Sequence, residues 1–118
     1  MIVYVIEDDR AVRSALTVFL EEEGYDVCPF GNAASFLAGA TPTADDLILL
    51  DLGLPDISGT ELHALLRKKG VTSQVVAISG LRSGPFEAAV QEIKPIAAFR
   101  KPLDLPALLS GMTAALRT

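Results

Sequence analysis

Acidic side chains follow two apolar runs that are predicted to be buried strands. Glu7, Asp8 and Asp9 come directly after the first run, and Asp51 comes directly after the third. Two unit charges about 4 Å apart repel each other by about 4 kcal/mol at an effective dielectric constant of about 20. If the two strands are neighbours, either some of these carboxyl groups have raised pKa values or a cation binds between them. An all-oxygen site with few protein ligands favours Mg²⁺.

Two further polar residues are predicted at the same edge of the sheet. Ser79 ends the fourth apolar run, and Lys101 follows the fifth. In an open parallel sheet, ligands bind beyond the carboxyl ends of the strands. A lysine ammonium can pair with a phosphoryl oxygen, and a serine hydroxyl can donate a hydrogen bond to another. Carboxylates, a hydroxyl and an ammonium at one edge therefore indicate phosphoryl chemistry.

Each of these residues also has a purely structural interpretation. Glu7, Asp8 and Asp9 open a predicted helix, where acidic side chains favour the helix dipole. Asp51 could cap or stabilise a turn, and Lys101 could be a solvated strand end. The structural interpretation is the stronger one for the acidic triplet alone. The placement of all these residues at one edge favours a functional site.

The elements that must position these residues alternate between two hydrophobic periods. Runs rich in β-branched residues alternate with segments of helical periodicity, and several helical segments have a recognisable start or stop, such as Gly24 or the capping-box sequence Ser58–Glu61. The runs are residues 2–6, around 27, 47–51, 75–79 and 97–100, and the helical segments are 12–23, 33–40, 58–70, 86–93 and 105–116. Five strand–helix units predict one α/β domain over residues 1–118, a doubly wound parallel sheet with helices on both faces.

Composition excludes several classes of protein. The chain has 118 residues, of which 50% are hydrophobic, and its formal net charge is −5. Nucleic-acid binding by this chain alone is not expected, because such binding requires neutralisation of phosphates. No apolar stretch approaches the ~20 residues needed to span a bilayer. The single cysteine cannot form an internal disulfide, and no export signal precedes the first strand, so we expect a cytoplasmic domain.

The ordered set of motifs resembles the receiver domain of two-component response regulators, the CheY-like family. The likeness covers essentially the whole chain. It rests on Val3–Asp9 as the first strand with its acidic pair, Asp51–Gly59 as the phosphoacceptor motif, Ser79-Gly80 as the hydroxyl residue with a small neighbour, and Lys101-Pro102 as the terminal motif. Ala11-Val12-Arg13 and Phe36-Leu37 are similar to receivers of the FixJ/NarL kind, which often precede a helix-turn-helix.

The resemblance implies a role for each matching residue. Asp51 would accept a phosphoryl group from a sensor histidine kinase or a phosphotransfer protein. Asp8 would bind Mg²⁺ directly, Glu7 mainly through water, and Gly53 through its backbone carbonyl. Ser79 would contact the bound phosphoryl group, and Lys101 would pair with it.

The resemblance also implies a fold and a mode of action. The family's strand order is 2-1-3-4-5, with five flanking helices in the flavodoxin-like arrangement. Such a protein is a switch with possible self-dephosphorylation rather than a conventional enzyme. Homodimerisation through the fourth and fifth helices is a further expectation, and no contact with a membrane is expected.

The sequence departs from the family pattern in two places. Receivers usually carry Tyr or Phe three places before the lysine, but here that place is Ala98, while Phe99 lies one place later and is expected in the core. Lys94-Pro95 stands where Gly-Ala is common, which predicts an abrupt end of the fourth helix. These departures leave a second hypothesis open, a receiver-like module that binds its partner independently of phosphorylation.

Other interpretations are weaker. A haloacid-dehalogenase-type phosphatase needs an acid two places after its nucleophile, and here that place is Gly53. A flavodoxin-like nucleotide binder is disfavoured because an acidic first loop would repel phosphate. His63 is expected on a helix surface, and Cys28 is expected to be a small apolar group in the second strand rather than a redox sensor.

Overall fold

One parallel sheet organises the chain. The computed structural model describes residues 1–116. Within that range five strands pair in the order β2-β1-β3-β4-β5, which confirms the predicted α/β fold and strand order. The strands are β1 (Ile2–Ile6), β2 (Asp26–Phe30), β3 (Leu47–Asp51), β4 (Gln74–Ser79) and β5 (Ala97–Arg100).

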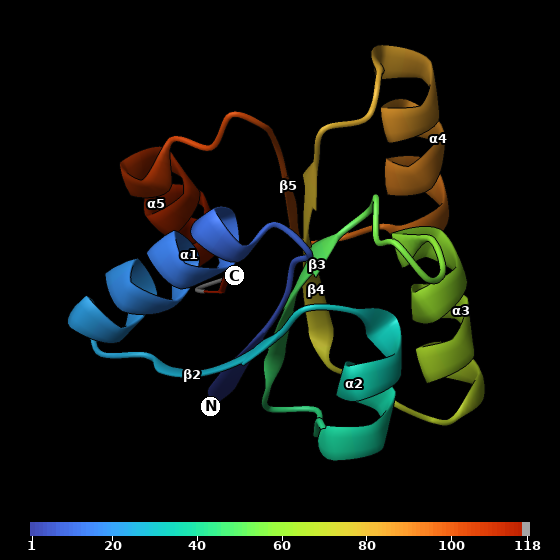
Figure 1. Cartoon of the computed structure of the whole chain (residues 1–118), viewed down its shortest axis with the longest axis horizontal. Coiled ribbons are helices and arrows are strands. Elements are labelled where there is room, and N and C mark those ends of the chain that lie inside the picture. Colours follow the sequence, from blue (N-terminus) through green and yellow to red (C-terminus); the bar gives the residue numbers. More distant parts are fainter. Residues whose placement is uncertain (117–118) are drawn as a thin grey trace.

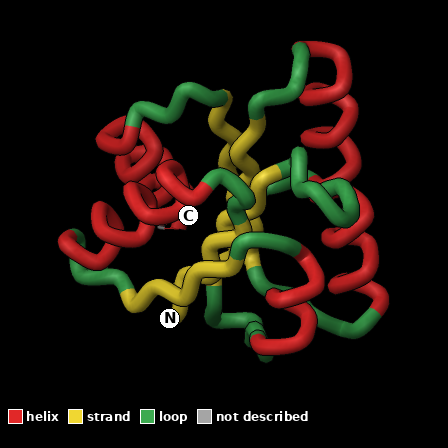
Figure 2. The backbone as a smooth tube through the Cα atoms, in the orientation of Figure 1, coloured by secondary structure: helices red, strands yellow, loops and turns green. Residues whose placement is uncertain are grey.

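Helices cover both faces of the sheet (Figure 1). They are α1 (Arg10–Glu22), α2 (Ala33–Gly39), α3 (Gly59–Lys68), α4 (Ser83–Ile93) and α5 (Leu105–Leu116). α1 and α5 lie on one face, and α2, α3 and α4 lie on the other, with the strands between them (Figure 2). Among the described residues, no helix combines the length and the apolar character that a bilayer crossing requires.

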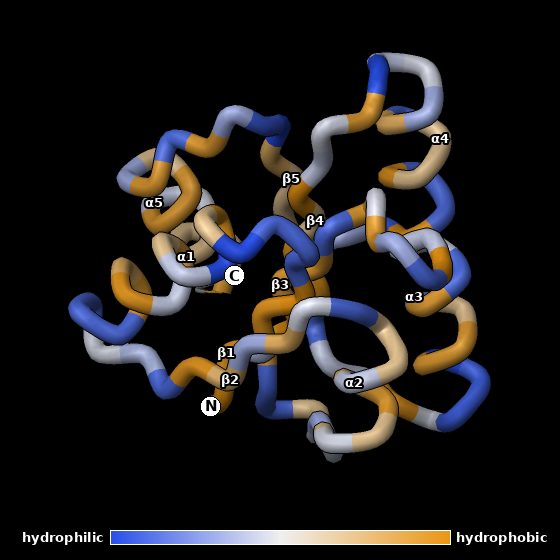
Figure 3. Tube along the Cα trace, viewed as in Figure 1, coloured by the Kyte–Doolittle hydropathy of each residue, from blue (hydrophilic) through white to orange (hydrophobic). Residues whose placement is uncertain are grey.

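Alternating strand residues feed two separate cores. In β1, Tyr4 and Ile6 join the cluster under α2, α3 and α4, whereas Val3 and Val5 join the cluster under α1 and α5. β3 is buried along its whole length. A parallel sheet covered on both faces requires apolar residues at every position of its central strands. The apolar residues therefore concentrate in the middle layer of the molecule (Figure 3).

The helix ends match the predicted signals. The Ser58 side chain accepts a hydrogen bond from the backbone N–H of Glu61 at 3.1 Å and caps α3. The Asp104 side chain accepts one from Ala107 at the start of α5. α4 ends at Ile93, and Lys94 follows with φ of +54°, which confirms the abrupt end expected before Pro95.

The start of α4 differs from the prediction. α4 begins at Ser83, before the Gly84-Pro85 pair that was expected to precede it. Proline is tolerated there because N–H groups of the first helical turn have no partner within the helix.

β2 is an edge strand with half-exposed residues, which explains how it accommodates Pro29.

Asp46, just before β3, ties the N-terminus to the loop ahead of it. Its carboxylate accepts hydrogen bonds from the backbone N–H groups of Ile2 and Thr43, both at 2.9 Å. Burial raises the pKa of Asp46, but these hydrogen bonds outweigh burial and leave the pKa below its usual value. Because the folded-state pKa is depressed, the stabilisation is present above about pH 4 and is lost as the pH falls through the folded-state pKa.

Replacement of Asp46 by alanine should therefore lower the free energy of unfolding at neutral pH by about 1–3 kcal/mol, since two donors lose their acceptor. The difference between variant and wild type should shrink as the pH falls below about 4. Urea unfolding at several pH values measures this. Asp45→Ala removes the same charge at the adjacent exposed position and should cost much less. Equal costs for both variants would contradict the assignment.

Candidate functional site

The adjacency of β1 and β3 brings the acidic residues together. Ile6 pairs with Leu50 in the sheet, so Glu7 and Asp51 follow at neighbouring strand ends. Glu7 and Asp51 are buried, with 0% and 2% of their surfaces exposed, whereas Asp8 is exposed. One carboxylate oxygen from each of the three residues lies within 4.8 Å of the others. The predicted cluster at one edge of the sheet is therefore present.

Lys101 reaches this acidic cluster from the end of β5. Its Nζ lies 2.6 Å from Oε1 of Glu7 and 3.2 Å from Oδ2 of Asp51. The ammonium thus contacts both buried carboxyl groups while remaining partly open to solvent. It offsets part of the repulsion between two acidic groups in a region of low dielectric constant.

The pKa values of the two buried carboxyl groups, Glu7 and Asp51, shift in opposite directions. Burial, reinforced by the adjacent Asp51 carboxyl group, raises the pKa of Glu7 to about 8. Burial also favours a raised pKa at Asp51, but hydrogen bonding to Glu7 and to the Gly53 N–H, together with the charge of Lys101, leaves that pKa below its usual value. Burial lowers the pKa of Lys101, but its two acidic partners outweigh this and raise it. Asp51 is therefore the ionised carboxylate of the pair.

The donor set suits a divalent cation. Oε1 of Glu7 is buried and accepts no well-oriented hydrogen bond from the described residues, although the Lys101 ammonium lies beside it. Asp8 and Asp51 supply further carboxylate oxygens within reach of the same point. Oxygen donors of this kind, with one side open to water, fit Mg²⁺, which keeps several waters when bound.

Ser79 and Gly53 also lie at this edge. The hydroxyl of Ser79, buried at the end of β4, accepts a hydrogen bond from the backbone N–H of Leu81 at 2.9 Å. Gly53, in the loop after β3, donates its backbone N–H to Oδ1 of Asp51 at 3.0 Å. This hydrogen bond holds one oxygen of Asp51, while Oδ2 faces Lys101.

Comparison with known proteins assigns the family. The response regulator receiver domain matches residues 3–113 of the chain. The chain belongs to the response regulator receiver family. This confirms the resemblance and makes it a receiver domain of two-component response regulators.

Several known receiver-containing proteins are similar along nearly the whole chain. The transcriptional regulatory protein FixJ of Azorhizobium caulinodans is 32% identical over 97% of the chain and 54% of its own length. The tetrathionate response regulatory protein TtrR of Salmonella typhimurium is 34% identical over 97% and 55%. The CheY-like receiver of Methanospirillum hungatei superposes with a TM-score of 0.83, at 26% identity over 98% of the chain and 93% of its own. The chain spans about half the length of these curated relatives.

In this receiver, Ala98 packs against the cluster under α2, α3 and α4. Phe99 points to the opposite face and packs against the cluster under α1 and α5, where its ring lies close to Gly111. On the α4 side, the guanidinium of Arg100 lies 5.0 Å from the ring centre of Phe86. Arg100 also donates hydrogen bonds to the Ser83 hydroxyl and the Leu81 carbonyl. An arginine thus links β5 to the start of α4 in this receiver.

Three residues considered from sequence lie outside the acidic cluster. The Asp9 side chain accepts hydrogen bonds from the N–H groups of Ala11 and Val12 and caps α1. His63 is half-buried on α3, more enclosed than the surface position expected. Burial lowers its pKa. Cys28 is half-buried in β2.

Sequence reasoning gave no role to two arginines that border the site. Arg13 contacts the backbone between β1 and α1, and Arg100 contacts the loop after β4. Both donate to backbone carbonyls, which leave no trace in the sequence pattern. The only signal was the Ala11-Val12-Arg13 likeness to one kind of receiver.

Proposed function

We propose that this receiver accepts a phosphoryl group on Asp51, with Mg²⁺ bound by the acidic cluster, and that the modified domain presents a changed surface to a partner or output domain. Response regulators interact with histidine kinases or phosphotransfer proteins, so the donor would be a phosphohistidine of such a protein. The exchange is expected in the cytoplasm. The domain would act as a switch rather than a conventional enzyme.

The proposed transfer requires positioning and charge neutralisation more than acid–base chemistry. An oxygen of the Asp51 carboxylate attacks phosphorus, a P–O bond forms, and the P–N bond to the donor imidazole breaks. Lys101 would pair with a phosphoryl oxygen, and the Ser79 hydroxyl would donate to another. Glu7, Asp8, Asp51 and the Gly53 carbonyl would hold Mg²⁺, which when bound would neutralise charge on the phosphoryl oxygens. Later attack by water would restore the carboxylate and release phosphate.

The observation that carries this proposal is the contact of Lys101 with the ionised carboxylate Asp51 inside a cluster of three acids. A structural ion pair alone would need one acid for one base. Here one ammonium faces two buried carboxyl groups with a third beside them, and a bound divalent cation would favour the ionised form of all three.

Incubation of the wild-type chain with Mg²⁺ and acetyl phosphate, followed by intact-mass measurement, tests the proposal. We expect one added phosphoryl group per chain, and release of that group by hydroxylamine, which cleaves acyl phosphates. An unchanged mass under these conditions would contradict the proposal.

Removal of Mg²⁺ should abolish phosphoryl incorporation as completely as removal of acetyl phosphate. With EDTA in place of Mg²⁺, we expect phosphoryl incorporation to fall to background. Asp8→Asn should weaken Mg²⁺ binding by about tenfold or more, because a ligand carboxylate is lost. Titration calorimetry measures the affinity. Asp9→Asn is the matched control, since asparagine is an equally good helix cap and removes the same charge. Similar losses in both variants would contradict a direct role for Asp8.

A second candidate is a receiver that binds its partner independently of phosphorylation. The observation that favours it is Ala98, which leaves the α4 face of β5 without the usual aromatic side chain. Partner affinity would then be the same for wild type, Asp51→Asn and the phosphorylated protein. A difference between the phosphorylated and unmodified protein would exclude this candidate.

Homodimerisation through α4 and α5 is part of the proposed switch. Sedimentation velocity with and without beryllofluoride, a phosphoryl mimic, tests it. We expect a larger sedimenting species with the mimic. A monomer in both conditions would leave a partner protein as the proposed target of the switch.

A further inference from the structure

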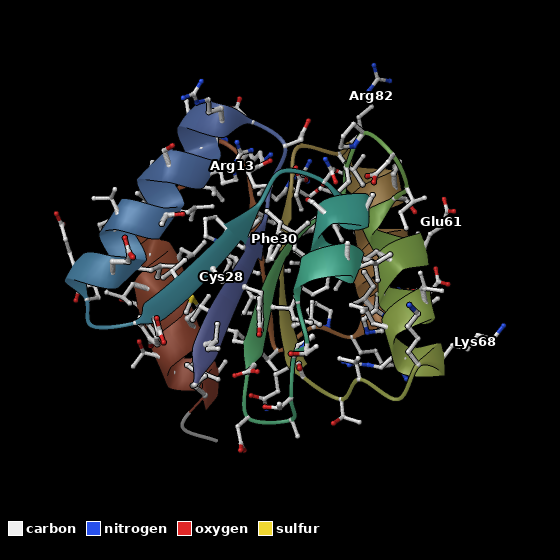
Figure 4. The ribbon with its side chains drawn as sticks, turned by 60° about the horizontal axis from the view of Figure 1, so that its bottom comes forward. Arg13, Cys28, Phe30, Glu61, Lys68 and Arg82 are labelled. Carbon is white, nitrogen blue, oxygen red and sulfur yellow. The ribbon has the colours of Figure 1, made fainter. Side chains whose placement is uncertain are left out.

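The side chain of Arg13 is directed from α1 toward the segment that carries the acidic residues (Figure 4). Its Nη1 donates to the backbone carbonyl of Glu7 at 2.8 Å and to that of Asp8 at 3.3 Å. The guanidinium also lies close to the chain after β2, because a Cβ atom at Gly31 would be 3.1 Å from Nη1. One nitrogen thus joins two successive carbonyls in the loop between β1 and α1.

With these contacts, both backbone polar groups of Glu7 and one of its carboxylate oxygens are hydrogen-bonded. Its backbone N–H donates to the carbonyl of Phe30 at 3.0 Å, and Oε2 accepts a hydrogen bond from the N–H of Asp9 at 3.3 Å. Arg13 holds the remaining backbone group, the carbonyl. The two carbonyls that Arg13 binds belong to the peptide units on either side of the Asp8 Cα, so their orientation determines where the Asp8 side chain points. Hydrogen bonds from a charged donor are about twice as strong as neutral ones.

We infer that Arg13 is a positioning residue for the metal site: it fixes the backbone of Glu7 and Asp8 so that both side chains face Asp51. This inference deepens the proposed function and rests on it, since the ligands matter only if the acidic cluster binds Mg²⁺. Among the described residues, Arg13 makes no hydrogen bond or ion pair with a carboxylate, and its role is exerted through the backbone.

Positioning and simple electrostatics predict opposite effects. Arg13 is a cation near an acidic cluster, so loss of its charge alone would strengthen the attraction of the cluster for Mg²⁺. Loss of positioning would weaken Mg²⁺ binding, because misoriented ligands no longer converge on one point. The sign of the change in affinity therefore separates the two effects.

Arg10 provides a matched control. It lies three positions earlier in α1 and is exposed, and its side chain makes no hydrogen bond or ion pair with the part of the chain that the structure describes. Arg10→Gln removes the same charge from the same helix without disturbing the two carbonyls. Arg13→Lys keeps the charge and offers a donor nitrogen, on a shorter side chain, for one of the two carbonyls.

The experiment measures Mg²⁺ affinity by titration calorimetry at fixed ionic strength for the wild type and the three variants. We expect the dissociation constant of Arg13→Gln to rise by about 10- to 100-fold, as is typical when an outer-shell partner of a metal ligand is lost. Arg10→Gln should bind as well as wild type or slightly better, and Arg13→Lys should recover most of the affinity. Equal affinities for Arg13→Gln and Arg10→Gln would overturn the inference.

A metal-free measurement separates this inference from the proposed function. Hydrogen exchange at the Asp9 amide, which donates to Glu7, reports the order of the segment without Mg²⁺. We expect faster exchange in Arg13→Gln than in Arg10→Gln, with unchanged urea stability showing that the effect is local. If the wild type binds no Mg²⁺, the proposed function fails, and this exchange rate alone decides whether Arg13 orders the segment. An unchanged rate would overturn its role.

Discussion

Asp51→Asn is expected to lower phosphoryl incorporation from acetyl phosphate by about two orders of magnitude or more, because the amide is a poor nucleophile and cannot form an acyl phosphate. Asp51 is the expected phosphoryl acceptor because its pKa is lowered and Lys101 contacts it. Glu7 is less suited as the acceptor, because burial and the adjacent Asp51 raise its pKa to about 8 when no cation occupies the cluster. Intact-mass measurement against time gives the rate.

The fold should survive this substitution. Asparagine has nearly the shape of aspartate, and its Oδ1 can still accept the hydrogen bond from Gly53. Asp45→Asn is the control, since Asp45 is an exposed carboxylate just before the opposite end of β3. It should accept the phosphoryl group at the wild-type rate. Incorporation that persists unchanged in Asp51→Asn would show that another residue is the acceptor.

Gly59→Ala should destabilise the protein by about 3 kcal/mol, because overpacking against a rigid backbone costs this much. Gly59 is buried at the start of α3, where a Cβ atom would lie 2.7 Å from Cα of Leu52 and 2.9 Å from the carbonyl oxygen of Asp51. Both obstacles are backbone atoms of the segment that ends β3, so the segment or the helix must move. The free energy of unfolding in urea measures the effect.

Gly84→Ala is the matched control. Gly84 also lies in the first turn of a helix, but a Cβ atom there would meet no described atom within 4 Å. Alanine favours a helix over glycine by up to about 1 kcal/mol, whereas a Cβ atom directly before Pro85 disfavours helical backbone, so the two effects oppose each other and the change in stability should be much smaller than in Gly59→Ala. A loss of stability as large in Gly84→Ala as in Gly59→Ala would show that close approach is not the cause.

The same contact links stability to the site. Movement of the segment after β3 would shift Asp51 relative to Lys101, and misplacement of a reacting group by about 1 Å can lower a rate about 100-fold. Gly59→Ala should therefore also slow phosphoryl incorporation in the fraction of molecules that remains folded. An undiminished rate per folded molecule would mean that α3 moves instead of the strand.

Local signals in the sequence predicted the elements well. Alternation of short apolar runs with helical segments follows from burial of both faces of the sheet, and such a pattern does not depend on which strands pair. Side-chain caps such as Ser58 and Asp104 act on N–H groups within three residues, so they too can be read locally. The beginning of α4 was misplaced because Pro85 is compatible with either side of a helix start.

The residue types of the site were also predictable, but their convergence in space was not. Residue types at the strand ends indicated carboxylates, a hydroxyl and an ammonium, and they converge only because β1 pairs with β3. The sequence does not encode that pairing in any short pattern. The unequal pKa values of Glu7 and Asp51 depend on burial and on contacts between strands that lie far apart in the chain.

By itself, the sequence determined the alternation of strands and helices, the acidic and basic residues available at the strand ends, and the family. Tertiary structure alone decided that Lys101 contacts both Glu7 and Asp51, that Arg13 binds the carbonyls of the acidic segment, and that Gly59 must lack a side chain. The physical reason is the separation along the chain over which each interaction acts. Periodicity and capping act over a few residues, whereas these contacts join atoms whose proximity arises only when the sheet is assembled.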